Sequence, residues 1–337
     1  MFRRLFEKVV LNSNRSRPNG ARDEQRLEIG EIESLESREM LAGDVEVFVN
    51  FAGDVRVVGD AASNDIGVFR TPGRLLHIHG NDNTTITHEG NTSREIFLDV
   101  FDNTGSIRRN LTIDMNAGND VVSMADLGIN GNLKVQLDQG SDLFDMRTSF
   151  VGNNVVVNGG GGRYADYLSI ESVSMLGNLK MNAGASALFS DTMRLGSVLV
   201  AGNSTLVGSA NGHQVLIDGV VVLGDSRIST GQGDDSVDVT SFEVEKASSI
   251  STGSGHDLIE LGALKTVGDF RVSAGSGNDV MRFVENDGLN SEFLGAVRYS
   301  GGSGIDELAL RGDTIYASFG SPVMSQFEFV MAIFGVE

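Results

Sequence analysis

The amino-acid sequence predicts an all-β fold in which residues 44–337 form a parallel β-solenoid (β-helix or β-roll) of about 22-residue coils. Two observations carry this prediction: loops containing glycine and aspartate recur at a fixed spacing, and alternating apolar residues follow each loop. A third is the composition, with 43 Gly, 3 Pro and no Cys among 337 residues. Residues 1–43 are assigned to a short helical or disordered segment that precedes the repeats.

The spacing is clearest in two stretches, residues 110–146 and 225–310. Each copy of the repeat has a glycine-containing loop that ends in an aspartate. Neighbouring copies within each stretch lie 22 residues apart, except for the last step of 27 residues. The aspartates that end these loops are Asp120, Asp142, Asp235, Asp257, Asp279 and Asp306.

Apolar residues two and four positions after each aspartate predict a strand with one buried face, because side chains alternate between the two faces of a strand. These pairs are Val122/Met124, Phe144/Met146, Val237/Val239, Ile259/Leu261, Met281/Phe283 and Leu308/Leu310. An incoming strand is marked seven positions before each aspartate, at Ile113, Val135, Ile228, Ile250, Val272 and Tyr299. Each coil is therefore expected to run as strand, tight loop, strand, turn, short third segment and turn.

A unit of this length cannot bury its own apolar face, so neighbouring coils are expected to stack and to pair equivalent strands in parallel. The alternative is an antiparallel β-sandwich of many short strands. A sandwich, however, does not predict side-chain chemistry that repeats at a fixed spacing, and the solenoid is therefore preferred.

The repeat is imperfect in the middle of the chain and near its start. After residues 159–162 the aspartate, Asp166, comes two residues late, and Ser186 and Ser204 stand where two further aspartates are expected. Residues 45–105 match the repeat least but are still assigned to the solenoid. With that assignment, residues 45–335 supply about 13 coils.

The formal net charge of -20 comes from the repeats, since residues 1–42 carry equal numbers of basic and acidic side chains. Such a surface repels nucleic acid and anionic membranes and attracts cations. The absence of cysteine excludes a disulfide framework and a thiol nucleophile. No apolar stretch is long enough to span a membrane, and the N-terminus does not match a standard secretory signal.

The strongest loops, of the form Gly-x-Gly-x-Asp, have the composition of a calcium site. Glycine accepts positive φ and can turn loop carbonyls toward one point, where the aspartate adds a carboxylate. Calcium prefers 6–8 oxygen ligands, which two stacked loops together can provide. Stacked carboxylates about 5 Å apart would repel each other by about 3 kcal/mol at an effective dielectric constant of 20, and a bound cation would relieve this repulsion.

These loops resemble the hemolysin-type calcium-binding (RTX-like) nonapeptide, Gly-Gly-x-Gly-x-Asp-x-apolar-x. Residues 301–309 fit it in full, whereas residues 230–238, 252–260 and 274–282 lack the first glycine. The chain departs from the family by having one such loop per coil instead of two. The resemblance implies calcium held at Gly231, Gly233, Asp235, Gly253, Gly255, Asp257, Gly275, Gly277, Asp279, Gly302, Gly304 and Asp306, with Asp120 and Asp142 as weaker candidates. Gly-Asp turns that bind no metal are the alternative.

A second resemblance lies in residues 35–41, Leu-Glu-Ser-Arg-Glu-Met-Leu. They are similar to the LEPR-XLL motif, Leu-Glu-Pro-Arg-x-Leu-Leu, which precedes the repeats of some bacterial surface and exported proteins. Ser37 and Met40 depart from it. The resemblance implies an extracellular or cell-surface location, and the alternative is a helix that caps the first coil.

The sequence favours a structural or adhesive module that binds calcium, with a cell-surface or extracellular polysaccharide or protein as a candidate partner. The runner-up functions are a carbohydrate-active β-helix, such as a polysaccharide lyase or hydrolase, and a metal-free spacer. No catalytic residues are assigned, because no acid–base group stands apart from the repeat chemistry. His77 and His79, with His88 nearby, suggest a transition-metal site, which is disfavoured because no acidic partner lies at a fixed spacing.

Overall fold

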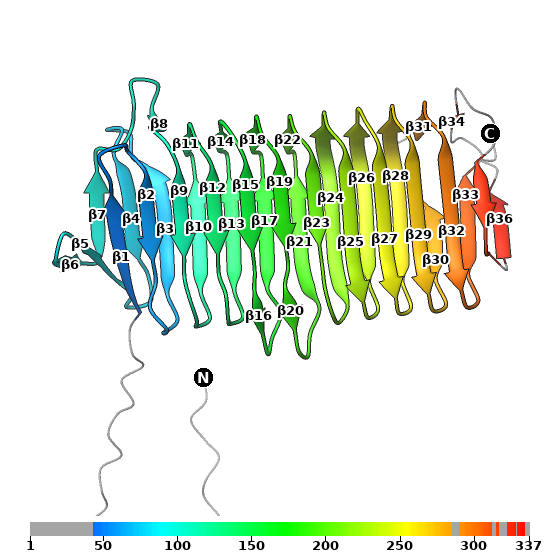
Figure 1. Ribbon diagram of the computed structural model, residues 1–337, viewed down its shortest axis with the longest axis horizontal. Helices are drawn as coiled ribbons and strands as arrows, with labels where there is room; N and C mark the ends of the chain where they lie inside the picture. The colour runs from blue at the N-terminus through cyan, green and yellow to red at the C-terminus, as the bar shows by residue number, and fades with distance from the viewer. Residues whose placement is uncertain (1–42, 285–289, 312–314, 317–321, 328, 334–337) are drawn as a thin grey trace, which may run out of the picture. The chain divides into compact units, whose positions relative to one another are not determined.

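The computed structural model confirms the predicted fold class: the described residues form strands, turns and loops with no helix, and most of the strands stack in parallel coils (Figure 1). The structure describes residues 43–284, 290–311, 315–316, 322–327 and 329–333. The solenoid belongs to a compact unit that spans Leu41–Glu337. The segment with the LEPR-XLL resemblance lies outside the described residues.

The strands belong to two long sheets and one short one. The 14-stranded sheet holds β1 (Asp44–Val49), β2 (Val55–Val58), β5 (Thr85–His88), β6 (Asn91–Ser93), β9 (Leu111–Asp114), β12 (Leu133–Gln136), β15 (Val155–Asn158), β19 (Leu179–Asn182), β23 (Ser204–Val207), β25 (Ser226–Gln232), β27 (Ser248–Ser254), β29 (Phe270–Ser276), β32 (Val297–Ser303) and β35 (Val323–Ser325). The two-stranded sheet pairs β16 (Gly161–Gly162) with β20 (Ala185–Ser186).

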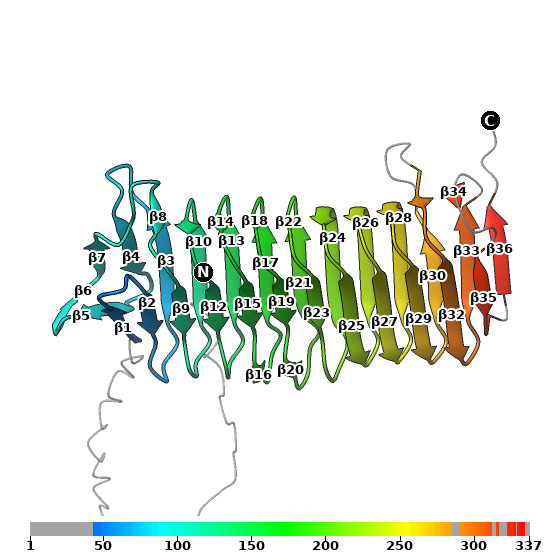
Figure 2. The same cartoon turned by 45° about the horizontal axis from the view of Figure 1, so that its top comes forward.

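The 20-stranded sheet supplies the second and third segments of each coil. It holds β3 (Asp65–Arg70), β4 (Leu76–Gly80), β7 (Glu95–Leu98), β8 (Ser106–Ile107), β10 (Val121–Ala125), β11 (Gly128–Ile129), β13 (Leu143–Arg147), β14 (Phe150–Val151), β17 (Tyr167–Glu171), β18 (Ser174–Met175), β21 (Asp191–Gly196), β22 (Leu199–Val200), β24 (His213–Val222), β26 (Ser236–Val244), β28 (Leu258–Thr266), β30 (Val280–Phe283), β31 (Glu292–Phe293), β33 (Glu307–Arg311), β34 (Ile315–Tyr316) and β36 (Phe329–Ile333). In β24, β26 and β28 the second and third segments merge into one bent strand (Figure 2).

Equivalent strands of successive coils pair in parallel and in register. In the first sheet Ile228 pairs with Ile250, and Ile250 pairs with Val272. In the second sheet Val237 pairs with Ile259. Because the repeat spacing equals the circumference of a coil, each apolar residue of the repeat stacks on its counterpart one coil away.

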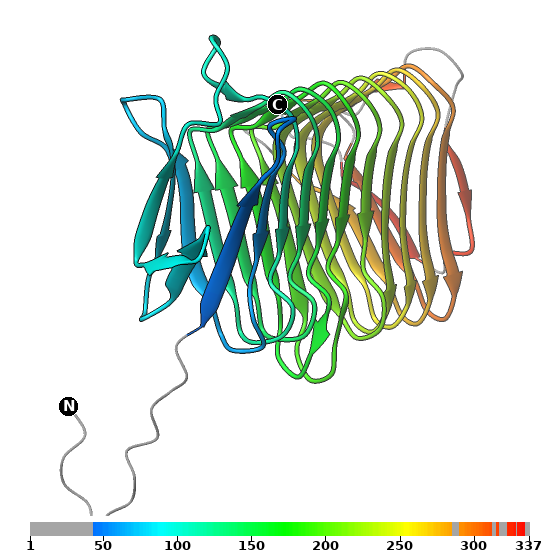
Figure 3. The same cartoon turned by 60° about the vertical axis from the view of Figure 1, so that its left-hand side comes forward.

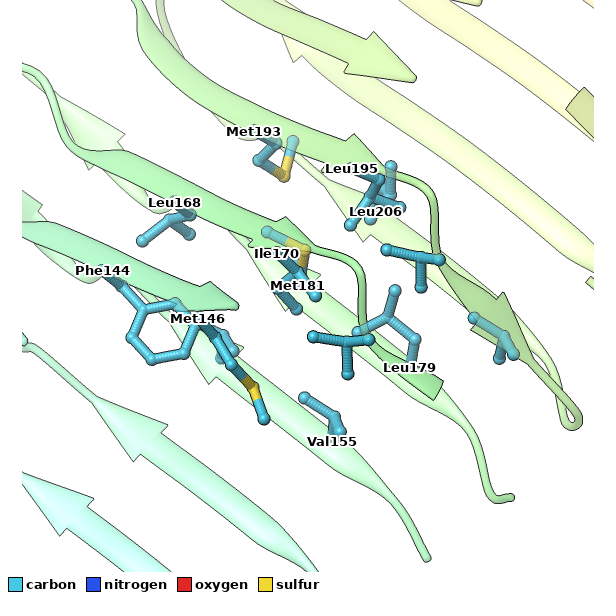
Figure 4. Close-up of a cluster of buried hydrophobic side chains, with 14 of the residues drawn as sticks. Phe144, Met146, Val155, Leu168, Ile170, Leu179, Met181, Met193, Leu195 and Leu206 are labelled. Carbon is cyan, nitrogen blue, oxygen red and sulfur yellow. The ribbon is translucent and has the colours of Figure 1, made fainter. Parts of the chain in front are cut away.

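The stacked apolar residues form one continuous core. All of the predicted strand pairs are buried except Leu310, which is partly buried against the core, and all six residues that mark incoming strands are buried. Figure 4 shows Phe144, Met146, Leu168 and Ile170 of neighbouring coils pointing into this interior. Burial of one face in every coil is what drives the coils together.

The prediction of about 13 coils was wrong: the structure has about 10, because most of residues 45–105 form antiparallel hairpins at one end (Figure 3). Strand β3 pairs antiparallel with β4, β4 with β7, and β5 with β6. Only β2, β3 and β8 pair in parallel with the next coil. The segment lacks the repeated loop, and tight turns at positive φ, at Arg74 between β3 and β4 and at Glu89 and Gly90 between β5 and β6, reverse the chain instead.

A ladder of asparagine side chains closes another corner of the coils. The Nδ2 groups of Asn132, Asn154 and Asn178 each donate a hydrogen bond to the Oδ1 atom of the asparagine one coil earlier, at 3.0 Å. The backbone N–H groups of the same residues donate to the same oxygens. The ladder therefore satisfies turn groups that no strand pairs. The spacing of the glycine-aspartate loops did not predict it.

Candidate functional site

The predicted aspartates all come together. Asp235, Asp257, Asp279 and Asp306 lie where a strand of the first sheet turns into a strand of the second, and each is at most 3% exposed. Asp120 and Asp142 hold the same place in earlier coils. We call the whole set the aspartate column; in chain order it consists of Asn64, Asp120, Asp142, Asp166, Asp191, His213, Asp235, Asp257, Asp279 and Asp306.

One hydrogen bond repeats along the column. The backbone N–H of Asp235 donates to Oδ1 of Asp257, at 2.9 Å, and the N–H of Asp257 donates to Oδ1 of Asp279 at the same distance. The backbone carbonyl of Asp235, in turn, accepts the N–H of Leu258 at the start of the next strand. Each carboxylate thus caps a buried N–H group that the sheets leave unpaired, which gives the repeated aspartate a structural role.

Four members of the column were missed from the sequence: Asn64, Asp166 as a full member, Asp191 and His213. Ser186 does not take an aspartate's place but donates a hydrogen bond to the Asp191 carboxylate, and Ser204 lies in β23, where it pairs with Ser226. The loops before Asp166 and Asp191 are longer, so these residues follow the previous member after 24 and 25 residues. Counting from the glycines at a fixed offset therefore pointed to the wrong residues.

The loop glycines have the backbone conformation that the sequence predicted. Their φ angles are positive, from 94° at Gly233 to 139° at Gly277. The coils also approach so closely that a Cβ atom on Gly255 would collide with the carbonyl oxygen of Gly233, and one on Gly277 with that of Gly255. Glycine is thus required by both torsion angle and stacking distance.

The second carboxylate oxygen has no hydrogen-bond partner in several members. This holds for Oδ2 of Asp120, Asp142, Asp166 and Asp279 within the described residues. Desolvation by burial raises the pKa of Asp120 and Asp166 to about 7 and that of Asp142 to about 8. The Coulombic repulsion of neighbouring aspartates adds to the rise in the pKa of Asp142.

In the later coils, threonine hydroxyls partly offset the effect of burial on the carboxylates. Thr230 donates a hydrogen bond to Oδ2 of Asp235. At Asp257, burial raises the pKa only to about 6, because hydrogen bonds from Thr252 and from the backbone of Asp235 favour the ionised form. In the loop that ends at Asp257, the threonine that begins the loop therefore favours the ionised form of the carboxyl.

His213 interrupts the run of carboxylates. Its Nδ1 atom lies 3.4 Å from Oδ1 of Asp235, and its Nε2 atom lies 3.6 Å from Oδ2 of Asp191. Its backbone N–H donates to Oδ1 of Asp235 as an aspartate's would, and Nε2 accepts the N–H of Ser209 at 3.3 Å. His213 keeps the column's hydrogen bond while placing an imidazole between two carboxylates.

The donor atoms match calcium chemistry in kind. Carboxylate and carbonyl oxygens are the ligands that calcium prefers, and the unpartnered Oδ2 atoms are buried oxygens that a cation would compensate. One oxygen of each carboxylate is already committed to a backbone N–H. The part of the chain that the structure describes holds no group of three or more acidic or histidine side chains arranged for a metal. A bound ion would therefore draw most of its ligands from loop carbonyls.

The three histidines of the disfavoured transition-metal site do not come together. The ring centroids of His77 and His79 lie 5.3 Å apart with the rings tilted by 36°, but Nδ1 of His88 contacts the carbonyl oxygen of Val47 on another strand pair. His77 does have an acidic partner, Glu95, at 2.9 Å, which its sequence spacing did not reveal because the antiparallel pairing of β4 and β7 brings it there. His256 is exposed and lies in the glycine loop before Asp257, apart from these residues.

Comparison with known proteins adds no identification. No protein-family model, no curated protein and no solved structure matches the chain. A search of the described residues for a helix long and apolar enough to cross a membrane finds none. The fold alone defines the class of this protein, which is a parallel β-solenoid with a buried aspartate column.

The raised pKa values make stability depend on pH. A carboxyl whose pKa is higher in the folded than in the unfolded state binds more protons when folded, so stability falls as pH rises from about 4 to about 8.

We expect Asp142→Asn to remove part of this loss, on the order of 1–3 kcal/mol at pH 8.5, since Asn64 shows that an amide fits the column. Thermal melts in chelator between pH 5 and 8.5 measure it, with Asp82→Asn, an exposed turn residue, as control. Equal pH dependence in wild type and Asp142→Asn would contradict the assignment.

Proposed function

We propose that the chain is a structural and adhesive β-solenoid that works outside the cell or on its surface. The observation that supports it is the in-register stacking of the coils around one continuous apolar core. In such a scaffold the buried side chains stabilise the stack of coils, and the outward side chains of successive coils are available to contact a partner. The chain's lack of cysteine and its acidic surface accord with an exported protein.

A test for enzymatic activity separates this proposal from the runner-up, a carbohydrate-active β-helix. Purified protein is incubated with neutral and acidic polysaccharides, with and without calcium, and new reducing ends and unsaturated products are measured. The scaffold role predicts that product formation stays at the level of the buffer blank. Turnover that is lost on mutation of one acidic residue would favour a lyase or hydrolase instead.

A second proposal concerns calcium, which the buried, unpartnered Oδ2 atoms favour. The carboxylate oxygens would come from Asp235, Asp257, Asp279 and Asp306, with Asp120 and Asp142 as weaker candidates. The glycine loops would contribute carbonyl oxygens. When bound, the ion would supply positive charge between stacked carboxylates. Asp257 has a column member on both sides, whereas Asp306 follows the irregular step of 27 residues.

We therefore expect Asp257→Asn to lower the calcium stoichiometry more than Asp306→Asn does. Affinity should be modest, with Kd on the order of 10⁻⁴–10⁻³ M as in extracellular modules. Several such sites at millimolar calcium would add about 2–4 kcal/mol through mass action. Isothermal titration and melts of wild type and both variants decide the question. A wild type that binds no calcium at 10 mM, roughly ten times the weakest Kd expected, and melts identically in chelator is a metal-free spacer.

A further inference from the structure

A polar groove runs along one corner of the solenoid, next to the N-terminal hairpins. It has a volume of about 710 Å³ and lies between the tip of the β3–β4 hairpin, the loop before β8, and the turns that lead into β11, β14 and β18. Figure 1 shows β8, β11, β14 and β18 in a row along this edge. The groove is separate from the aspartate column, which lies inside the coils.

Three uncommitted polar side chains repeat along the groove. Asp126, Thr148 and Ser172 occupy equivalent turns of successive coils, with φ angles of 56°, 48° and 55°. Their backbone N–H groups bond to the next coil, but their side chains are exposed and make no hydrogen bond within the described residues. A carboxylate and two hydroxyls thus face the groove at a step of about 4.8 Å, the spacing of paired strands.

An aromatic ring lies beside these groups. Phe150 lines the groove and is 38% exposed, although it is a large apolar residue. Its in-register neighbours are Gly128 and Ser174, so no large side chain stacks on it from the adjacent coils. A ring left uncovered in this way can pack its apolar face against a ligand.

The walls of the groove are held in place by their own hydrogen bonds. Arg70 Nη1 donates to the carbonyl oxygen of Gly105 at 3.2 Å, and the Thr71 hydroxyl donates to the carbonyl oxygen of Leu75 at 3.2 Å. The first contact ties the hairpin to the loop before β8. A site whose walls are fixed before binding loses less conformational entropy when the ligand binds.

We propose that this groove binds a segment of a neutral polysaccharide. Sugar hydroxyls donate to carboxylates and exchange hydrogen bonds with threonine and serine hydroxyls, and the C–H face of a pyranose ring packs on an aromatic ring. Groups that repeat at each coil suit a ligand that is itself a repeat. The net charge of -20 disfavours an acidic chain. The inference rests on the adhesive role and names its partner class.

Affinity electrophoresis and titration calorimetry of the full chain test the site, with laminarin, mannan and dextran as neutral probes and polygalacturonate as the acidic one. We expect at least one neutral probe to bind, and Phe150→Ser or Asp126→Asn to weaken it about tenfold or more, or about 1.4 kcal/mol. Ser174 occupies the position equivalent to Phe150 in the next coil, so serine is compatible with this strand. Asparagine accepts positive φ, so both variants should fold. Tyr167→Ser, which removes an aromatic ring 39% exposed outside the groove, is the matched control and should bind as wild type.

The outcomes separate this inference from the broader proposal. Neutral-glycan binding that survives both groove variants places the adhesive site elsewhere and overturns the inference while keeping the adhesive role. Binding of polygalacturonate alone overturns the neutral ligand class. If no probe binds while the melting temperature confirms a folded protein, both the groove and the adhesion to glycans are rejected, and the structural role alone stands.

Discussion

Replacing Gly277 by alanine should destabilise the solenoid by about 3 kcal/mol or more, a large effect for the addition of a single methyl group. At φ 139° an alanine is strained, and its Cβ atom would collide with the backbone carbonyl of Gly255, which cannot rotate away as a side chain can. Relief would require these two coils to separate, with loss of the hydrogen bond that the Gly255 N–H donates to the carbonyl oxygen of Ser276. The urea midpoint of unfolding measures the effect.

Gly73 provides the control for this prediction. It lies in the β3–β4 hairpin, its φ is not in the left-handed region, and the nearest atom to a Cβ there is the Thr71 hydroxyl oxygen at 3.7 Å. Gly73→Ala should be neutral or stabilise the protein by up to about 1 kcal/mol, since alanine restricts the unfolded chain. Equal costs for Gly277→Ala and Gly73→Ala would show that the loops are not stacked as closely as described.

The second large effect is expected at Ile259, in the middle of the best repeats. Its side chain is 0% exposed and lies in register between Val237 and Met281 of the neighbouring coils. Ile259→Ala should cost about 2–5 kcal/mol, because it removes buried methylene groups and leaves a cavity that in-register neighbours cannot fill. The free energy of unfolding in urea is the appropriate measurement.

Glu260, one position further along β28, tests the face assignment. It points outward and forms a surface ion pair with Arg282, whose Nε lies 2.6 Å from Oε1. Glu260→Ala should cost under about 1 kcal/mol, because surface pairs contribute little to stability. A larger cost for Glu260→Ala than for Ile259→Ala would mean that the strand is shifted by one residue.

The regular part of the fold could be predicted from the sequence because residues of the same chemical kind recur at equivalent positions of successive coils. Val237, Ile259 and Met281 share a spacing and a face, so period-two alternation and the 22-residue repeat led to the same strand. The glycine conformations followed in the same way, since only glycine suits both a positive φ and the close stacking seen at Gly255.

The irregular parts of the fold could not be predicted from the sequence, for physical reasons. Loop insertions leave the strands in register but shift the sequence count, so Asp191 and His213 were missed although they complete the column. The N-terminal hairpins pair residues with no fixed spacing, as Glu95 and His77 show. The hydrogen bond from each aspartate's N–H to the next carboxylate depends on side-chain direction, which periodicity does not specify.

Disulfide trapping tests the central claim, in-register parallel stacking, most directly, because the chain has no native cysteine. Ser249 of β27 pairs with Arg271 of β29, so cysteines at both positions should form a disulfide on mild oxidation, since adjacent strands lie within the range a disulfide spans. Cysteines at Ser249 and Arg298, two coils apart, should not link. Efficient linkage of the 249–298 pair, or none of the 249–271 pair in folded protein, would contradict the stacking of the coils.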